Sequence, residues 1–527
     1  MTATSEGHSR GRALSLKLTI LALLSASLLL LGACGNGSAS GDPSGVTASS
    51  VQATTNPLVA QYSVTTSSAA TVAVQFGTTT SYGFTTSSQA IEAGTPATFL
   101  VAGMKSNTLY HMRAVVSDSG GAQHYDNDHT FTTAAVDPAR VPAIQVTTTA
   151  GMTPATGVEL LSLNAGPSNQ YMILAVDPEG NLIWYYDFST SLGMPQPVKL
   201  LPNGHILAMI CPNPGLPGGT LQEIDLAGNL VHQFDYQQLQ QKLNNAGYSI
   251  HVLSIDHDFV LLPNGHLLII VSDSRVFTDL PGYPGQTTVL GDAIVDLDSN
   301  YNPVWVWDAF DHLDVNRHPM NFPDWLHANA LVYIANDGNL LLSLRHQSWV
   351  VKIDYANGNG TGDVLWKLGY QGDFDLSSGD DSQWFAAQHD VNLASKNGTG
   401  NFQLAMFDNG DDRIIDGSPI SCEGVLPPLP NCYSVAAIFD VNESTMAASR
   451  QWGYQTPYSY WGGVTQVLPD TNIFVDESTP ADLNNEGMRA VEVTQTANPQ
   501  VVWQLQINNQ NSYRTMHLPS LYPGVQW

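Results

Sequence analysis

Three histidines occupy the same place in a repeated stretch of this sequence, and histidine can act as a nucleophile, an acid or a base. His257, His327 and His389 each precede an apolar run that leads into a turn, 8, 11 and 9 residues ahead of a turn glycine. Arg345 follows His327 by 18 residues, at the end of "NLLLSLR". A neutral imidazole can attack a sulfuryl or phosphoryl centre, and a guanidinium can bind the oxygens of that group. This set therefore predicts transfer of an oxyanion group.

These four side chains can cooperate only if the fold gathers them. From about residue 160 the chain repeats an apolar strand with a turn, as in "LLPNGHILAMI" and "LLPNGHLLIIV". Six copies of an aspartate turn followed by an aromatic strand, such as "VDPEGNLIWYY", alternate with it. Such units bury both faces when they pack radially, which predicts a six-bladed β-propeller over residues 160–527. A β-helix or paired sandwiches remain as alternative folds. In a propeller the inner strands share one rim, so we expect the histidines and Arg345 to converge there.

Composition supports an all-β chain with more than one domain. The 527 residues include 45 glycines and 30 prolines, and only 12% are charged. Short Val, Ile, Thr and Tyr runs lie between Asn-Gly and Asp-Gly turns, a pattern typical of strands. Residues 56–135 resemble a small fibronectin III/Ig-like β-sandwich, with Tyr110 in "MKSNTLYHMRAVV" as its corner tyrosine.

The N-terminus resembles a bacterial lipoprotein signal peptide. Basic residues precede the apolar stretch "LTILALLSASLLLLGAC". We predict a signal peptide over residues 1–33, lipidation at Cys34 and a flexible Gly/Ser/Thr-rich tether over residues 34–55. The mature protein would be exported and lipid-anchored to the bacterial cell envelope, on the periplasmic or cell-surface side, with the membrane as a partner. A plain secretory signal or a short membrane anchor is the alternative.

Charge and cysteines restrict the partners further. The net charge of −28, from 18 basic and 46 acidic residues, argues against nucleic acid. Cys422 and Cys432 bracket the proline-rich "EGVLPPLPN", and export favours a disulfide between them over two free thiols. Cys211 is then unpaired and buried. No cysteine spacing is typical of a zinc site, so we predict no metal.

Several segments together resemble the bacterial arylsulfotransferases, also called aryl-sulfate sulfotransferases. They are "HDFVLLPNG", "DWLHANALVY", "LLLSLRHQSWVVKID", "QHDV" and "SYRTMHLPSLYP", and the resemblance covers most of residues 160–527. It implies an exported six-bladed propeller that moves a sulfuryl group from an aryl sulfate donor to a phenolic acceptor in a ping-pong reaction. It also implies no cofactor and no phosphoadenosine phosphosulfate, which agrees with the absence of a G-x-x-x-x-G-K-[ST] loop.

The resemblance also assigns roles to residues. His389 in "QHDV" matches the nucleophile that becomes sulfated. His257, His327 and Arg345 match positions that bind the sulfuryl group and assist proton transfer, and His327 is our choice of acid/base group. Residues whose part stays open are a nearby hydroxyl (Ser459 or Thr456), the aryl-stacking candidates Trp325 and Trp461, and Arg514. We assign His312, His318 and His346 to loops or outer strands.

Two other functions stay open. One is a metal-dependent propeller hydrolase or lactonase, in which the histidines and Asp258 or Asp390 hold a divalent ion. Arg345 counts against it, because a guanidinium repels a nearby cation. The other is a non-catalytic surface lipoprotein that binds a partner or a sulfated glycan. The sequence also leaves a homodimer open.

Overall fold

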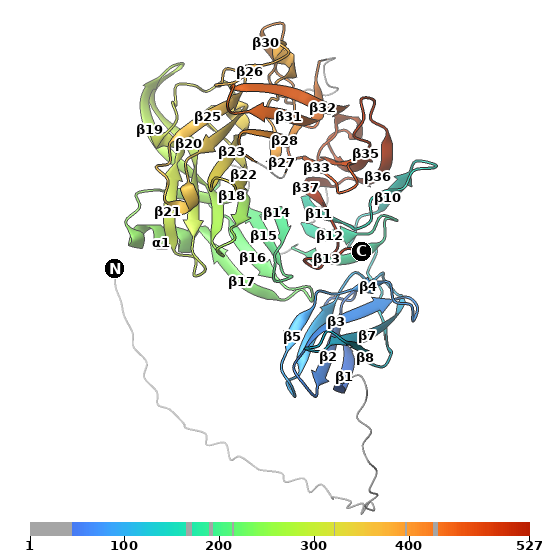
Figure 1. The fold of residues 1–527 in the computed structure, drawn as a ribbon. Coiled ribbons are helices and arrows are strands. Elements are labelled where there is room, and N and C mark those ends of the chain that lie inside the picture. Colours follow the sequence, from blue (N-terminus) through green and yellow to red (C-terminus); the bar gives the residue numbers. More distant parts are fainter. Residues whose placement is uncertain are drawn as a thin grey trace, which may run out of the picture. The chain divides into compact units, whose positions relative to one another are not determined.

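The computed structural model describes residues 45–164, 171–188, 193–212, 216–320, 322–395, 398–424 and 431–527. These belong to one compact unit, Pro43–Trp527. The predicted signal peptide, Cys34 and the first part of the predicted tether lie outside the described residues. The described part confirms the all-β prediction, and its single α-helix is α1 (Tyr236–Ala246) (Figure 1). Across these residues no helix has the length and apolar character needed to cross a membrane.

Two sheets form the N-terminal part. One has the strand order β1-β2-β6, with β1 (Val46–Ala53), β2 (Ala60–Thr66) and β6 (Ala97–Val101). The other centres on β3 (Ala70–Gly77) and β7 (Leu109–Ser117) and includes β4 (Phe84–Thr85), β5 (Gln89–Ile91), β8 (Gln123–Tyr125) and β9 (His129–Thr132). Alternate residues of both sheets enter one apolar cluster that contains Tyr62, Phe76 and Phe99. The Tyr110 hydroxyl accepts a hydrogen bond from the Lys105 backbone N–H at 2.9 Å, as a corner tyrosine would.

The predicted tether is wrong in its second half, because residues 46–53 form β1 and pair with β2 in an antiparallel register. Gly, Ser and Thr dominate this stretch, which led to the expectation of a flexible linker. Val46 and Val51, however, pack against the apolar cluster of the two sheets. Such β-branched residues favour a strand once a partner edge is available.

Six larger antiparallel sheets follow along the chain, running from green to dark red in Figure 1. Each has four main strands that follow one another in the chain, except that the first sheet takes its fourth strand, β37, from the end of the described sequence. Two sheets have one added outer strand, and the added β26 pairs in parallel. The first sheet contains β11 (Val158–Asn164), β12 (Met172–Val176), β13 (Leu182–Asp187) and β37 (Asn511–Leu518), and the second contains β14 (Met194–Leu200), β15 (Ile206–Cys211), β16 (Thr220–Ile224) and β17 (Leu230–Asp235). The third contains β18 (Val252–Leu261), β19 (Leu267–Leu280), β20 (Tyr283–Leu297) and β21 (Pro303–Asp308), and the fourth contains β22 (Ala328–Ile334), β23 (Asn339–Leu344), β24 (Trp349–Ile353) and β25 (Val364–Gly369). The fifth contains β27 (His389–Leu393), β28 (Asn401–Asp408), β31 (Tyr433–Asn442) and β32 (Ala447–Pro457) with the added β26 (Asp375–Leu376), and the sixth contains β33 (Val464–Val467), β34 (Ile473–Glu477), β35 (Gly487–Val493) and β36 (Val501–Asn508) with the added β10 (Ile144–Thr148). A separate hairpin joins β29 (Arg413–Ile415) to β30 (Ser418–Ile420).

One edge strand of each large sheet contacts the corresponding edge strands of the neighbouring sheets. β37, β14, β18, β22, β27 and β33 contact one another in that order, and β33 contacts β37 again. The last strand of the chain therefore pairs with β11 and completes the first of these sheets. Strands inside the sheets are buried on both faces, which explains uniformly apolar runs such as "MILAV" in β12. The contact order of the edge strands brings residues far apart in the sequence to a common region.

Candidate active site

The three predicted histidines lie on the edge strands of three successive sheets. His257 lies in β18, where the pairing with β19 slips between Ile255 and Phe259. His327 directly precedes β22, and His389 is the first residue of β27. His257 and His327 adopt left-handed backbone angles, with φ of 65° and 53°. Such angles cost non-glycine residues about 1–3 kcal/mol each and gather where a side chain must be aimed.

The structure brings these side chains together through ring contacts. The centroids of the His257 and His327 rings are 4.6 Å apart in an edge-on arrangement. The Tyr513 ring of β37 contacts both His257 and His389, with centroid distances of 6.2 Å and 6.0 Å. Residues from sheets distant in sequence thus form one cluster, which we call the histidine cluster: His257, His327, His389 and Tyr513.

The hydrogen bonds around His389 determine which ring nitrogen carries the proton. Asn409 donates through its amide nitrogen to the carbonyls of Ser459 at 2.7 Å and Gly462 at 3.0 Å. Its amide oxygen must therefore accept, and it lies 2.7 Å from His389 Nδ1. His389 Nδ1 is then the donor, and in the neutral ring Nε2 carries the lone pair. No described residue bonds to that Nε2, so it can react with a ligand.

The surroundings keep His389 neutral. The residue is 2% exposed, and burial lowers the pKa of its imidazole well below the usual value. The nearby Arg345 guanidinium lowers this pKa further, while the bond to Asn409 opposes the change. The imidazole is accordingly unprotonated at neutral pH, the form in which it is a nucleophile.

Arg345 supplies the positive charge of the site. It follows β23 in a short 3-10 helix, η2 (Arg345–Gln347), and is 5% exposed. Nη1 lies 2.6 Å from His346 Nε2, and Nη2 donates to the Tyr460 carbonyl at 3.1 Å and to Asp411 Oδ2 at 3.2 Å. The Nε–H has no acceptor among the described residues. A buried donor of this kind suits an oxygen of a bound oxyanion.

The assignment of His346 to a loop or outer strand, away from the site, is wrong. Its ring centroid is 4.7 Å from that of His327, and burial lowers its pKa to about 3. Nδ1 bonds to the Asp324 carbonyl at 2.7 Å, so this nitrogen carries the proton and Nε2 accepts from Arg345. The sequence signal was present, because His346 is the immediate neighbour of Arg345.

Asp324 orients His327. The carboxylate oxygen Oδ2 accepts from His327 Nδ1 at 2.7 Å, which leaves Nε2 of His327 available. Burial raises the pKa of the Asp324 carboxyl, but His327 and the other histidines outweigh it and bring the pKa below its usual range. Ligand atoms of Asp324, His327 and His346 lie within 4.8 Å of one another, close enough to be tested as a metal site. Both nitrogens of His346, however, already have hydrogen-bond partners.

The chain is similar to known proteins over most of its length. The sequence pattern of the arylsulfotransferase (ASST) family matches residues 145–514, well over half of the chain. The chain belongs to the arylsulfotransferase family. The chain is 23% identical over 369 residues to the arylsulfate sulfotransferase AssT of Escherichia coli O6:H1 (strain CFT073). The match covers 58% of this chain and 58% of that relative.

Solved structures give a weaker likeness. A mutant apocarotenoid oxygenase from Synechocystis aligns with a TM-score of 0.32 and 10% identity, over 89% of this chain and 95% of the other. Dihydro-heme d1 dehydrogenase NirN aligns with a TM-score of 0.30 and 10% identity, over 68% of this chain and 75% of the other.

The residues left open by the sequence have distinct positions. Arg514 is buried beside the cluster, where Nη2 donates to the Asn329 carbonyl at 2.6 Å and Nη1 is 3.2 Å from Asp258 Oδ2. Asp390 lies 3.5 Å from Arg514 Nε. Arg514 thus neutralises carboxylates that the metal alternative needs as ligands.

Neither hydroxyl candidate projects freely toward the cluster. The Ser459 Oγ lies 3.2 Å from Thr479 Oγ1 and accepts from the Thr479 N–H at 3.0 Å, and the Thr456 hydroxyl donates to the Pro457 carbonyl. Ser459 contributes through its backbone carbonyl, which holds Asn409. Of the two tryptophans, Trp325 is buried and donates to the Arg317 carbonyl, whereas Trp461 stacks on Tyr513 at 6.0 Å.

A disulfide is connected to Arg345 through Tyr458 and Asp411. Cys422 and Cys432 are bonded, and Cys211 is free and buried. The disulfide packs with Tyr458 in a small apolar cluster, and the Tyr458 hydroxyl donates to Asp411. Burial raises the pKa of Asp411 to about 6, and Arg345 opposes this change. The disulfide and Tyr458 therefore position the Asp411 carboxylate that accepts a hydrogen bond from Arg345.

Proposed function

We propose that this protein is an aryl-sulfate sulfotransferase that moves a sulfuryl group from an aryl sulfate ester to a phenol through a sulfated His389. The observation that carries the proposal is the free Nε2 of a neutral His389, buried beside Arg345 and two further imidazoles. No phosphoadenosine phosphosulfate and no metal takes part in the proposed reaction. Membership of the arylsulfotransferase family supports the substrate class.

In the first half-reaction, His389 Nε2 attacks the sulfur of the donor. An N–S bond forms, the bond between sulfur and the aryl oxygen breaks, and the phenolate leaves with that electron pair. We place the free Arg345 Nε–H and the imidazoles of His257 and His327 against the sulfuryl and leaving oxygens, where charge develops, because these groups surround His389. His327, whose Nδ1–H is held by Asp324, delivers a proton from Nε2 when that ring is cationic, and the phenol departs.

The second half-reaction reverses these steps. His327 Nε2 takes the proton of the acceptor phenol, the phenolic oxygen attacks sulfur, and the N–S bond breaks. His389 Nε2 regains its lone pair, and Asn409 keeps the Nδ1 proton in place throughout. One site thus serves donor and acceptor in turn, which is the basis of ping-pong kinetics.

We infer a six-bladed β-propeller as the architecture that supports this site. Six edge strands in closed sequential contact, and a last strand that completes the first sheet, support that reading. β10, which begins at residue 144, would be an added outer strand of the last blade, ahead of the expected start at residue 160. We infer that the two N-terminal sheets form a fibronectin III/Ig-like sandwich, since they share one apolar cluster. Export and lipid anchoring at Cys34 remain part of the proposal, as does a homodimer.

A burst assay tests the nucleophile. We expect wild-type protein to release 4-nitrophenol from 4-nitrophenyl sulfate in a burst and to gain the mass of one sulfuryl group. His389→Ala should show neither. His266→Ala is the matched control, because His266 pairs with Asp296 at a turn outside the histidine cluster and should leave the burst intact. A normal burst with mass gain in His389→Ala would refute the assignment.

The grouping of Asp324, His327 and His346 gives one reason to test a metal-dependent hydrolase as a second function. Against it, a metal would have to displace Arg345 from His346 Nε2, where the contact is 2.6 Å. Running the burst assay with a chelator separates the two proposals. Sulfuryl transfer through His389 predicts an unchanged burst, and loss of activity that added zinc restores would favour the hydrolase.

A further inference from the structure

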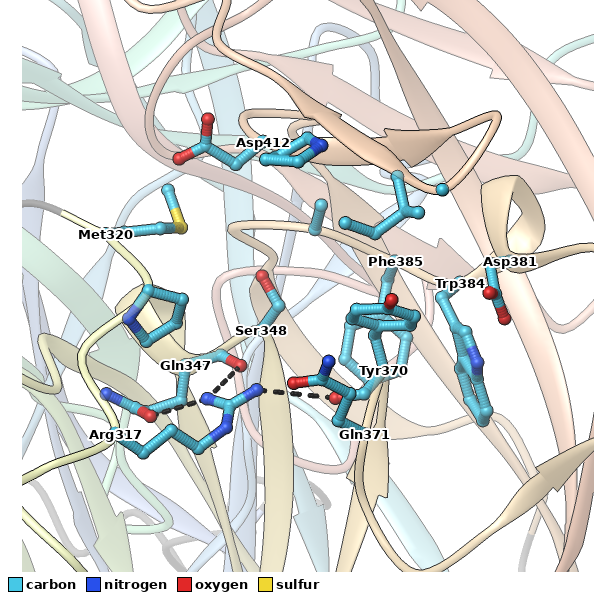
Figure 2. Close-up of a pocket in the computed structure, with 15 residues that line it drawn as sticks. Arg317, Met320, Gln347, Ser348, Tyr370, Gln371, Asp381, Trp384, Phe385 and Asp412 are labelled. Atoms are coloured by element: carbon cyan, nitrogen blue, oxygen red, sulfur yellow. Dashed lines mark hydrogen bonds between the residues drawn. The ribbon is translucent and has the colours of Figure 1, made fainter.

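A cavity, which we call the Arg317 pocket, lies beside the segments that carry the histidine cluster. Its volume is about 300 Å³, within the range of small-molecule sites. Figure 2 shows Arg317 on one wall and the rings of Tyr370, Phe385 and Trp384 on another. The hairpin β29–β30 contributes Ile414 and Pro419 to the lining.

The guanidinium of Arg317 is partly buried without a counter-ion. No carboxylate of the described residues lies within 4.0 Å of it. Its face rests on the Trp349 ring at 3.7 Å, Nη1 donates to the Gln347 carbonyl and Oε1, and Nη2 donates weakly to the Tyr370 carbonyl at 3.4 Å. Burial lowers the pKa of Arg317 to about 10, which reflects the cost of the unpaired charge.

The donor count leaves part of this guanidinium free. Three of its five N–H groups have acceptors in the described protein, and Nε–H and one Nη2–H have none. Free N–H groups on a guanidinium can bind the oxygens of a carboxylate or sulfonate through charge-assisted hydrogen bonds. An anion there would offset the burial of the charge.

Two carboxylates also line the pocket and must be weighed. Asp381 is exposed at its edge, and Asp412 is half-buried with a pKa raised by burial. Neither comes within ion-pair distance of Arg317.

The rest of the lining selects for an aromatic ligand. The half-buried Tyr370 ring and the exposed Pro319 present apolar surface, and the nearly buried Met320, Trp384 and Phe385 lie beneath them in the lining. An inorganic anion would leave this surface in contact with water, whereas an aromatic ring would bury it. We propose that the Arg317 pocket binds an aromatic molecule bearing a carboxylate or sulfonate, with the anion on Arg317 and the ring against Tyr370, Trp384 and Phe385.

The pocket is close to the histidine cluster along the chain. Gln347 and Arg345 are both in η2, and Asp412 follows the Asp411 that binds Arg345. Consecutive Cα atoms are about 3.8 Å apart, so these pairs of residues can be only a few ångströms from one another. The proposal concerns binding alone and does not rest on sulfuryl transfer.

The test is equilibrium binding of 4-hydroxybenzoate to the intact protein, measured by calorimetry, with neutral 4-hydroxybenzyl alcohol as the comparison. We expect the acid to bind about tenfold or more tightly than the alcohol, since charge-assisted hydrogen bonds contribute about 1.5–3 kcal/mol. Arg317→Gln should remove that difference. Arg275→Gln is the matched control, because Arg275 also rests on an aromatic ring but is paired with Asp308 and Asp311.

A second variant, which blocks the pocket, tests the proposal independently in case Arg317→Gln does not fold. Pro419 is exposed on the hairpin, and Pro419→Trp should fill the pocket without disturbing the core. It should abolish binding of the acid while the thermal unfolding temperature stays near that of the wild type. Equal binding of acid and alcohol, unchanged affinity in Arg317→Gln, or inorganic sulfate that binds as tightly as 4-hydroxybenzoate would overturn the proposal.

Discussion

Asn409 gives the sharpest test of the proposed chemistry, because it acts on the nucleophile without touching the substrate. Replacing it with leucine keeps the volume and removes the acceptor 2.7 Å from His389 Nδ1. The imidazole then loses the contact that fixes its tautomer, and a lone pair on Nε2 is no longer assured. The carbonyls of Ser459 and Gly462 also lose their donor.

The size of the effect follows from these bonds. Leaving a buried polar partner without a hydrogen bond costs about 1–3 kcal/mol, equivalent to roughly 5- to 150-fold in rate. We expect Asn409→Leu to slow the burst of 4-nitrophenol by that factor, with little change in the affinity for the donor. Affinity should hold because Arg345, His257 and His327 retain their positions.

The measurement is single-turnover stopped-flow absorbance with mass analysis of the sulfated chain. Asn339→Leu is a suitable control, since the Asn339 side chain also bonds to two backbone groups, accepting from the Tyr355 and Ala356 N–H, but lies beside a turn away from the histidine cluster. A burst in Asn409→Leu as fast as in the wild type, in protein that is folded by circular dichroism, would mean that the tautomer of His389 is not set as argued.

Two further predictions concern the cationic side of the site. Arg345→Lys should lower kcat/KM for 4-nitrophenyl sulfate by about tenfold or more in steady-state assays, because an ammonium cannot hold Asp411, Tyr460 and a sulfuryl oxygen together; an unchanged value would contradict this role. His346 stays neutral when folded but has an ordinary pKa when unfolded, so the unfolded chain binds more protons and stability falls as pH drops below about 6.5. Between about pH 7.5 and pH 5 this group should account for about 2 kcal/mol of lost unfolding free energy, and urea titrations should show that much less pH dependence in His346→Gln; equal slopes in the two proteins would count against it.

The sequence indicated the positions that recur with the fold but not their partners. His257, His327 and His389 could be found because each precedes an apolar run and a turn on or next to an edge strand, and the topology brings these positions close together. Arg345 followed from the same unit. Asn409, Asp411 and Asp324 could not be found in this way, since their roles depend on the paths of connecting segments that follow no repeat.

Tyr513 and the tether illustrate the same limit. Tyr513 reaches the histidine cluster only because β37 returns to the first of the six sheets, a long-range pairing with no local signal. Residues 46–53 became a strand because an unpaired edge of β2 was available, although their composition favours a linker. In both cases the pairing of strands distant in the sequence, and not the local sequence, determined the structure.

The place of β37 has a consequence for biosynthesis. Strands β11 and β37 pair although they lie at opposite ends of residues 158–518, so the first of the six sheets lacks its edge strand until residues 511–518 have been synthesised. Tyr513 joins the histidine cluster only at that point, after the earlier strands of these sheets have emerged. A polypeptide that stops before residue 511 would leave β11 as an open edge, available to pair with another chain.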